Sequence, residues 1–401
     1  MTPTHSFFLQ ILRDYLHQTE TAVPDHVDWN ELLQIAQHHK LTGIVYAQVQ
    51  NQMLASAEGA AVYPQFLQVF GSTVQNSMNR VASYRRFSQA VDSLGLPYLP
   101  FKGLTIAEAY PEPLLRTMSD LDVIIRAEDL EAIRSALCEI GFVVKQWSAD
   151  EWKYSDHGIL YELQQYLLRP NEDENEARVA YFEELWERSS GREGTCERLL
   201  DPNFSFLYLI VHISKHFRGR GVGFRQFYDL AILMHRFPDR FDWGRIRTDA
   251  ERIGLLRFTQ SCLSLCEAWF GVSAPLVKPP LRQELYETVT ANIFDYGVFG
   301  LENSSSKVNE LERVQRGADE SLTRSKLKVG RTLLFPSYRH LSSLERYRYL
   351  RGRPWLLPYA WIARLVKTKN KQFKLNVVNS LFTASQKNVD AVHAQLDELG
   401  L

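Results

Sequence analysis

The sequence predicts an α+β protein in which a small α/β unit, at about residues 95–170, is embedded in a mostly helical chain. Apolar side chains recur at helical spacing before and after this unit, whereas the unit alternates short β-rich runs with a turn and an amphipathic stretch. At 401 residues, the chain is long enough for two or three domains. We therefore expect an N-terminal helical segment at 1–94, the α/β unit at 95–170, a helical domain at 171–300, and a basic, aromatic helical region at 301–401.

The N-terminal segment contains two clear helical patterns. Apolar residues follow Asp28, a suitable N-cap, from Trp29 to Ala36 at helical spacing. Residues 69–90 contain few helix breakers and predict one long helix, which Gly95 and Pro97 bring to an end.

The α/β unit begins with an extended run at 97–101 and a turn at Lys102-Gly103. A short helix at 104–110, a strand at 121–125, an amphipathic helix at 127–140 and strands at 142–147 and 158–168 are expected to follow. Beyond residue 203 the pattern is helical again, with helices predicted at 204–217 and 224–236 and two more between 243 and 270. Residues 271–280 contain three prolines and predict a connector, and the polar stretch 302–325 predicts a loop or a surface helix.

Composition limits the classes of function. The net charge is -1, so any contact with nucleic acid or a membrane must come from a local patch. Four cysteines with no CxxC pair do not form a disulfide framework. The first 17 residues do not show the pattern of a secretory leader, so we expect none there, and no apolar run reaches the ~18 residues that span a bilayer. We expect a cytoplasmic protein without a transmembrane segment.

Two carboxylates one residue apart mark the most informative segment. Side chains alternate along a strand, so Asp120 and Asp122 should project from one face while Leu121 and Val123 project from the other. Two carboxylates this close repel each other unless a cation lies between them. Magnesium binds proteins through one or two carboxylates together with substrate phosphates. We therefore predict a magnesium and triphosphate site here, and expect Asp122→Asn to leave folding nearly intact.

Basic residues near this pair are suited to phosphate binding. Gly103 permits close approach of the backbone to a ligand, and Lys102 adds a full positive charge beside it. Arg116 supplies a second cation four residues before Asp120. Glu162, in the following strand pattern, is the expected third carboxylate.

This succession of Lys-Gly, a helix, an arginine and Ser-Asp-Leu-Asp before an apolar run resembles the polymerase-beta-like nucleotidyltransferase superfamily. Within it, the chain is most similar to a bacterial group called uncharacterised nucleotidyltransferases, and next to the nucleotidyltransferase toxins of toxin–antitoxin systems. Further similarities are Asp242-Trp243, Gly254-Leu255, His212 and His216 with Arg225 and Asp229, and the tail runs 334–337 and 353–359.

The resemblance implies a residue-by-residue assignment. Magnesium, or alternatively manganese, would be bound by Asp120, Asp122 and Glu162, which are also the catalytic residues, and the NTP would contact Lys102, Gly103, Arg116 and Ser119. Besides a long gap between the Lys-Gly turn and the Asp pair, two features depart from the superfamily pattern. Lys102-Gly103 replaces the usual glycine-serine pair, and Gln164-Gln165 stands where a His-Trp-like pair often follows the third carboxylate. Asp156 therefore remains an alternative to Glu162.

Two other clusters carry alternatives. His212 and His216 are one helical turn apart, as in zinc sites, but no third ligand is evident, and a packed pair is the simpler interpretation. With Arg225 and Asp229 they can instead line a cleft beside the α/β unit, or Asp229 can form a buried pair with Arg225. Residues 324–371 contain thirteen Lys or Arg and one acid, with aromatic residues interleaved. This pattern is compatible with a packed basic face, with tRNA or other RNA binding, or with peripheral membrane contact.

The expected reaction is magnesium-dependent transfer of a nucleoside monophosphate from an NTP to an acceptor: tRNA, a protein or a small molecule. The alternative is a non-catalytic module that binds a nucleotide or a partner and retains the fold. The intact Asp120, Asp122 and Lys102 favour the enzyme.

Overall fold

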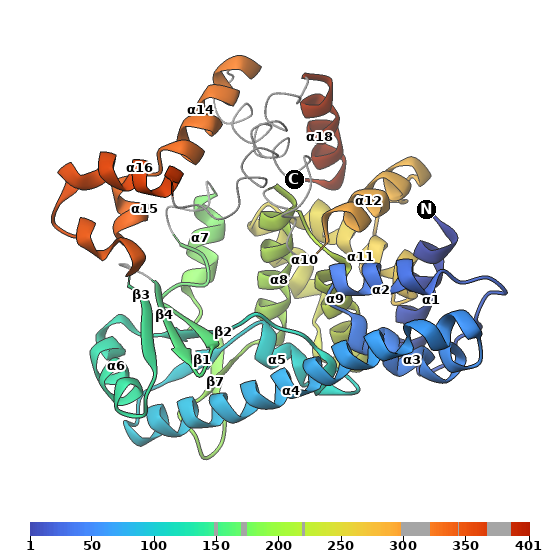
Figure 1. Cartoon of the computed structure of the whole chain (residues 1–401), viewed down its shortest axis with the longest axis horizontal. Coiled ribbons are helices and arrows are strands. Elements are labelled where there is room, and N and C mark those ends of the chain that lie inside the picture. Colours follow the sequence, from blue (N-terminus) through green and yellow to red (C-terminus); the bar gives the residue numbers. More distant parts are fainter. Residues whose placement is uncertain (148–150, 170–174, 219–220, 298–320, 344, 367–385) are drawn as a thin grey trace.

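The computed structural model describes residues 1–147, 151–169, 175–218, 221–297, 321–343, 345–366 and 386–401. It shows a five-stranded mixed sheet attached to a larger helical body (Figure 1). The predicted α+β architecture, with an α/β unit inside a mostly helical chain, is confirmed.

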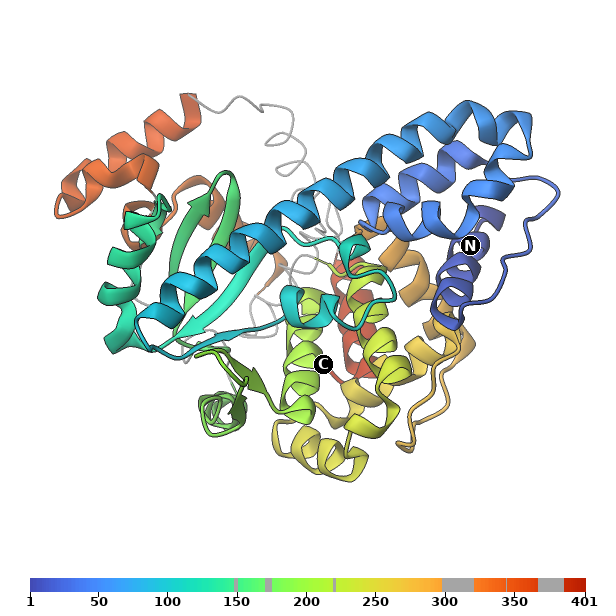
Figure 2. The same cartoon turned by 90° about the horizontal axis from the view of Figure 1, so that it is seen from below.

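Four helices precede the sheet, and the last of them joins the two halves of the molecule. Asp28 caps α2, as predicted, by accepting a hydrogen bond from the Glu31 amide. The fourth helix is longer than the predicted 69–90 and runs from the N-terminal helices across the sheet (Figure 2). Its C-terminal residues Phe87 and Val91 are buried against strand residues. The four helices are α1 (Pro3–His17), α2 (Trp29–His38), α3 (Thr42–Leu54) and α4 (Ala57–Ser93).

The sheet has the strand order β1-β2-β5-β4-β3, in which only β2 and β5 are parallel neighbours. The strands are β1 (Tyr98–Pro100), β2 (Asp120–Ile125), β3 (Val143–Trp147), β4 (Glu151–Asp156) and β5 (Ile159–Gln164). Strand β4 was not predicted because its charged residues hide a period-two pattern: Trp152 and Tyr154 are buried, and Glu151 and Lys153 face the other way.

Short elements connect the strands. The helix predicted at 104–110 is only α5 (Gly103–Ala107), and the turn η1 (Pro113–Leu115) leads into β2. The stretch predicted at 127–140 forms the turn η2 (Ala127–Asp129) and α6 (Leu130–Glu139), which buries Leu130, Ile133 and Leu137 but leaves Ile140 exposed.

The two faces of the sheet contact different cores. Leu121, Val123 and Ile125 of β2 pack with α4 and α6 in a small core. Ile124, on the opposite face, joins the large core of the helical body. Because side chains alternate along β2, Asp120 and Asp122 lie on the same face as Ile124, toward the helical body.

The helical body follows the sheet in the chain. The predicted helices at 204–217, 224–236 and 243–270 are confirmed, and two short strands pair just before them. The elements are α7 (Glu176–Glu183), β6 (Ser189–Gly191), β7 (Arg198–Leu200), α8 (Pro202–Arg218), α9 (Phe224–Arg236), η3 (Pro238–Arg240), α10 (Trp243–Arg252), α11 (Leu256–Phe270) and α12 (Gln283–Tyr296).

The C-terminal region has a separate small core, formed by Leu341, Tyr347, Leu350 and Ala360. Residues 302–320, most of the stretch predicted as a polar loop or surface helix, lie outside the described residues. The elements are α14 (Leu322–Leu334), α15 (Tyr338–Ser343), η4 (Glu345–Leu350), η5 (Pro354–Leu356), α16 (Leu357–Val366) and α18 (Gln386–Leu399).

Candidate active site

The strand pair β2–β5 brings three carboxylates to one face of the sheet. Asp120 and Asp122 are alternate residues of β2, and Asp122 is paired in register with Glu162 of the parallel strand β5. Residues paired across neighbouring strands share a face, so Glu162 projects to the same side as both aspartates. Asp122 is 7% exposed. Burial, reinforced by the negative charge of Asp120, raises the pKa of Asp122 above its ordinary value, although Lys102 opposes the shift.

Lys102 reaches this face from the turn after β1. Its Nζ lies 3.2 Å from Asp122 Oδ1, and it lies over the rings of Phe101 and Tyr208 at 4.8 and 5.7 Å. Burial by itself would lower the pKa of Lys102, but the charges of Asp122 and Asp120 raise it above its ordinary value. The ammonium group is therefore positively charged across the physiological pH range.

The backbone at Lys102 is strained. Its φ of 54° and ψ of −114° lie in a region that residues with a side chain rarely adopt. Such strain clusters at functional sites, where surrounding contacts hold it in place. The next residue is glycine, and a Cβ on Gly103 would lie 3.2 Å from Arg116 Nη1 and 3.4 Å from Met118, which is closer than most Cβ contacts. The Gly103 backbone therefore packs closely against Arg116 and Met118.

The guanidinium group of Arg116 stabilises the Lys102-Gly103 turn. Its Nε and Nη2 donate to the two carboxylate oxygens of Asp229 at 2.9 and 2.8 Å, and its Nη1 donates to the Gly103 carbonyl at 3.1 Å. The Tyr110 hydroxyl also donates to Asp229, at 2.7 Å. The alternative in which Asp229 forms a buried pair with Arg225 is therefore wrong: Asp229 pairs with Arg116, which connects the α/β unit to α9.

The two alternatives for the third carboxylate lie in different places. Glu162 is on the face of Asp122, where it forms an ion pair with Lys153. Asp156 projects to the opposite face, where it accepts a hydrogen bond from Ser83 of α4 at 2.6 Å and pairs with Arg86 at 3.1 Å. Glu162 alone of the two shares the face of the aspartate pair.

Sequence reasoning did not identify several neighbours of this face. The Gln164 side chain donates to Asp122 Oδ1 at 3.2 Å, and Tyr208 covers Lys102 from α8. Gln164 was identifiable in principle, because it follows Glu162 by two residues and therefore shares its face. Ser119, which was predicted to contact the NTP, is exposed and donates to Asp120 Oδ1 at 2.8 Å.

Helices α8 and α9 place further basic side chains next to Lys102. His212 and His216 contact each other through their Nε2 atoms, 3.2 Å apart. Burial, followed by the charge of Lys102, lowers the pKa of His212 well below its ordinary value. Arg225 Nη1 donates to the Thr117 carbonyl at 2.6 Å, so it braces the segment before β2. The histidine pair therefore lies beside the site, with a neutral His212.

The fit of a metal can be judged from the donors. Within the residues that the structure describes, no three His, Cys, Asp or Glu side chains are grouped closely enough to hold a metal ion by themselves. Lys102 instead forms an ion pair with Asp122, and Lys153 forms one with Glu162. Magnesium needs only one or two protein carboxylates when substrate phosphates and waters complete its shell. The oxygen donors on this face fit that requirement.

The basic, aromatic segment lies away from these carboxylates. Its described part runs to residue 366, without residue 344, and η4 contacts β3, an edge strand three positions from β2. Trp355 of η5 and Tyr359 and Ile362 of α16 are between 60% and 70% exposed, so these side chains are not packed on the body. Among the described residues, no helix combines the length and apolar character needed to cross a bilayer.

Comparison with known proteins supports one family. A family model described as "Uncharacterised nucleotidyltransferase" matches residues 25–271. The matched stretch includes the sheet, the Lys102-Gly103 turn and helices α8 to α11 but ends before the C-terminal region. No curated protein and no solved structure shows significant similarity to the chain.

Proposed function

Because this chain belongs to the uncharacterised nucleotidyltransferase family, we propose that it transfers a nucleoside monophosphate from an NTP to an acceptor in a magnesium-dependent reaction. The observation that carries the proposal is the register of β2 and β5, which aligns Asp122 with Glu162 on the face that Lys102 contacts. Three carboxylates and a charged lysine on one face have a chemical use in binding a metal–triphosphate complex.

In this proposal one or two of the carboxylates of Asp120, Asp122 and Glu162 would hold magnesium together with triphosphate oxygens. The metal would neutralise triphosphate charge and lower the pKa of the attacking group. Binding of the metal–nucleotide complex would replace Lys102 as the counter-ion of Asp122. The ammonium would then bind the triphosphate, and the Gly103 turn allows backbone to approach it. Ser119, exposed beside Asp120, is available for a further contact.

Glu162 and Arg116 have separate roles in the proposed reaction. An acceptor oxygen attacks the α-phosphorus, a new P–O bond forms, and the bond to the bridging oxygen of the β-phosphate breaks to release pyrophosphate. Glu162 orients the acceptor and takes its proton. Arg116 already binds Asp229 and the Gly103 carbonyl, so we assign it to positioning the turn, in place of the direct phosphate contact that the sequence suggested.

Incubation of the protein with α-³²P-labelled NTPs, magnesium and separate bacterial fractions of RNA, protein and metabolites tests this proposal. We expect label in one fraction and release of pyrophosphate, both abolished by EDTA and restored by magnesium. Manganese in place of magnesium tests the alternative metal. Nucleotide binding without label transfer or NTP consumption in any fraction would instead support the non-catalytic module.

Replacing Lys102 with glutamine should weaken NTP binding. Hydrogen bonds to charged groups contribute about 1.5–3 kcal/mol, so we expect the NTP KM to rise by about 10- to 100-fold. The matched control is Lys145→Gln, which removes one charge from an exposed position on β3. Equal NTP KM values for the two variants would show that Lys102 does not contact the nucleotide.

A further inference from the structure

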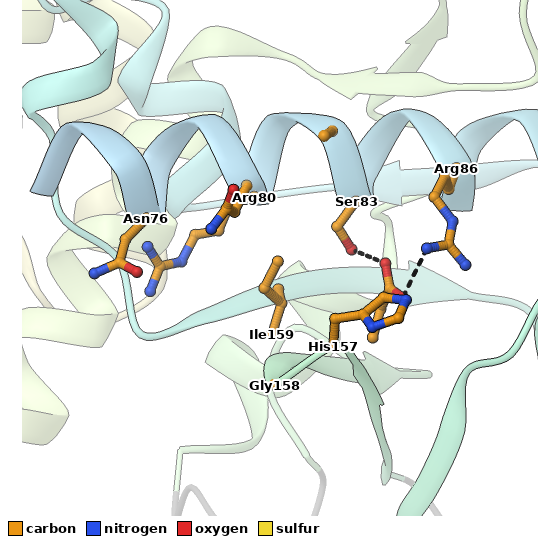
Figure 3. A pocket seen from close by; sticks show the side chains of 10 residues that line it. Asn76, Arg80, Ser83, Arg86, His157, Gly158 and Ile159 are labelled. Atoms are coloured by element: carbon orange, nitrogen blue, oxygen red, sulfur yellow. Dashed lines mark hydrogen bonds and ion pairs between the residues drawn. The ribbon is translucent and has the colours of Figure 1, made fainter. Parts of the chain in front are cut away.

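A cavity of about 430 Å³ lies at the end of the sheet where the parallel strands β2 and β5 begin. Helix α4 lines one side, and the β4–β5 turn lines the other (Figure 3). We call it the α4 pocket. It is lined by Asn76, Asn79, Arg80, Arg86, His157 and Ile159, among others. A volume of this size accommodates a small ligand or one nucleotide-sized group.

The α4 pocket lies at the end of the sheet where β2 begins with Asp120, and its strand residues Asp156 and Ile159 lie on the α4 face, opposite the face of the aspartate pair. Lys102 follows β1, which is one neighbour of β2 in the sheet. The pocket is lined by the turn that leads into β5, the other neighbour of β2. Ile159 lines the pocket, and the next residue, Leu160, is the register partner of Asp120. Of the three carboxylates, Asp120 is therefore the one nearest to the end of the strands where the pocket lies.

The chemistry of the pocket favours an anion. Arg86 is neutralised by Asp156, whereas Arg80 forms no ion pair with any of the described residues. Its Nε is buried, with no hydrogen-bond partner among the described residues. Burial lowers the pKa of Arg80, and the charge of Asp120 partly offsets this shift, which also places Arg80 near that carboxylate. A buried guanidinium N–H without an acceptor costs free energy until a ligand supplies one.

We propose that the α4 pocket is the acceptor subsite and that it binds a phosphate group carried by the acceptor, with Arg80 as the principal contact. This inference rests on the proposed function. In phosphoryl transfer the attacking and leaving oxygens are roughly in line across the phosphorus. If Lys102 binds the triphosphate, an acceptor whose phosphate is held in the pocket approaches the carboxylates from the end of the sheet where β2 begins, away from Lys102. The phosphate belongs to a small phosphorylated acceptor or to an RNA end, which share this chemistry.

A binding experiment tests the anion site without catalysis. The full-length protein, free of NTP and magnesium, is titrated with inorganic phosphate while the arginine Nε–H signals are followed by ¹H–¹⁵N NMR. The Arg80 signal is assigned by its loss in Arg80→Gln. We expect it to shift saturably as phosphate accepts its hydrogen bond. An Arg80 signal that does not move would overturn the proposal.

A second reporter measures how much Arg80 contributes. The ring signals of His157, assigned by their loss in His157→Asn, should follow the same titration. Asparagine tolerates the φ of 48° at this position. We expect Arg80→Gln to weaken phosphate binding by about 10-fold. Arg85→Gln, which removes an exposed charge from the same helix, should change it by less than about twofold. Equal weakening in both variants would indicate non-specific attraction and contradict the assignment.

Transfer kinetics test the acceptor role. Phosphorylated and dephosphorylated forms of a small acceptor and of an RNA end are compared, which distinguishes the two sources. We expect Arg80→Gln to raise the KM of the phosphorylated acceptor by about 10-fold and to leave the NTP KM unchanged, the opposite of the pattern for Lys102→Gln. Saturable phosphate binding without any transfer would sink the acceptor role and the proposed function. Transfer that Arg80→Gln does not affect would sink the acceptor role alone.

Discussion

Replacing Asp122 with asparagine is expected to lower the rate of nucleotidyl transfer by on the order of 10³-fold, the range seen when one preorganised electrostatic contact to a transition state is removed. Asp122 is the carboxylate in the middle of the site: Lys102 and Gln164 donate to it, and Glu162 faces it across the strands. The amide keeps the shape of the side chain but loses the negative charge that would bind the metal.

The same substitution should also cost some stability, contrary to the expectation from repulsion between two carboxylates. In the folded protein Asp122 is the nearest counter-ion of the mostly buried Lys102, so asparagine leaves that ammonium with a weaker acceptor. We expect the free energy of unfolding to fall by about 1–3 kcal/mol. Because domains have about 5–15 kcal/mol of stability, the variant should remain folded, and lost folding cannot account for the lost rate.

Measurements of initial rate at saturating NTP and of urea unfolding separate the two effects. Asp239→Asn is the matched control, since Asp239 is exposed in η3. It should match the unsubstituted protein in both measurements. If Asp122→Asn retained more than about a tenth of the transfer rate, a metal-binding role for Asp122 would be untenable.

Removing the Asp229 carboxylate should produce the largest loss of stability. Asp229 accepts two hydrogen bonds from Arg116 and one from Tyr110, and both charged residues are 5% exposed. Asp229→Ala would leave the Arg116 charge buried without a counter-ion. Breaking a buried pair in this way typically costs about 3–5 kcal/mol, and we expect a loss in that range in chemical unfolding of the ligand-free protein.

A double-mutant cycle tests whether the stranded Arg116 charge causes this loss of stability. Arg116→Met removes the charge that Asp229→Ala would strand, so the double variant should lose clearly less stability than the sum of the two single variants. Additive losses would mean that the pair does not stabilise the fold as a unit. Asp229→Asn keeps an acceptor oxygen, so it should lose less stability than Asp229→Ala and remain folded. Its NTP KM can then be measured. We expect this KM to rise, because Arg116 also binds the Gly103 carbonyl.

Local patterns in the sequence were enough to predict much of the fold. Helical periodicity located α8 and α9 to within two residues, and the residue preferences of caps identified Asp28. The two-residue repeat of a strand was enough to place Asp120 and Asp122 on one face. Strand β4 escaped prediction because half of its residues are charged, and α4 extends beyond the predicted helix because its packing on both cores outweighs weak local signals.

Contacts between distant segments could not be predicted in this way. The strand order pairs β2 with β5, whose partner residues are 40 positions apart in the chain, and so favours Glu162 over Asp156 as the neighbour of Asp122. The partner of Arg116 is 113 residues away, and Arg80 reaches the edge of the sheet from a helix that precedes it. The sequence by itself determined which residues carry charge and which face of a strand they project from, because these depend on local geometry. Only the tertiary structure decided which charges meet, because ion pairing depends on distances that folding sets between remote parts of the chain.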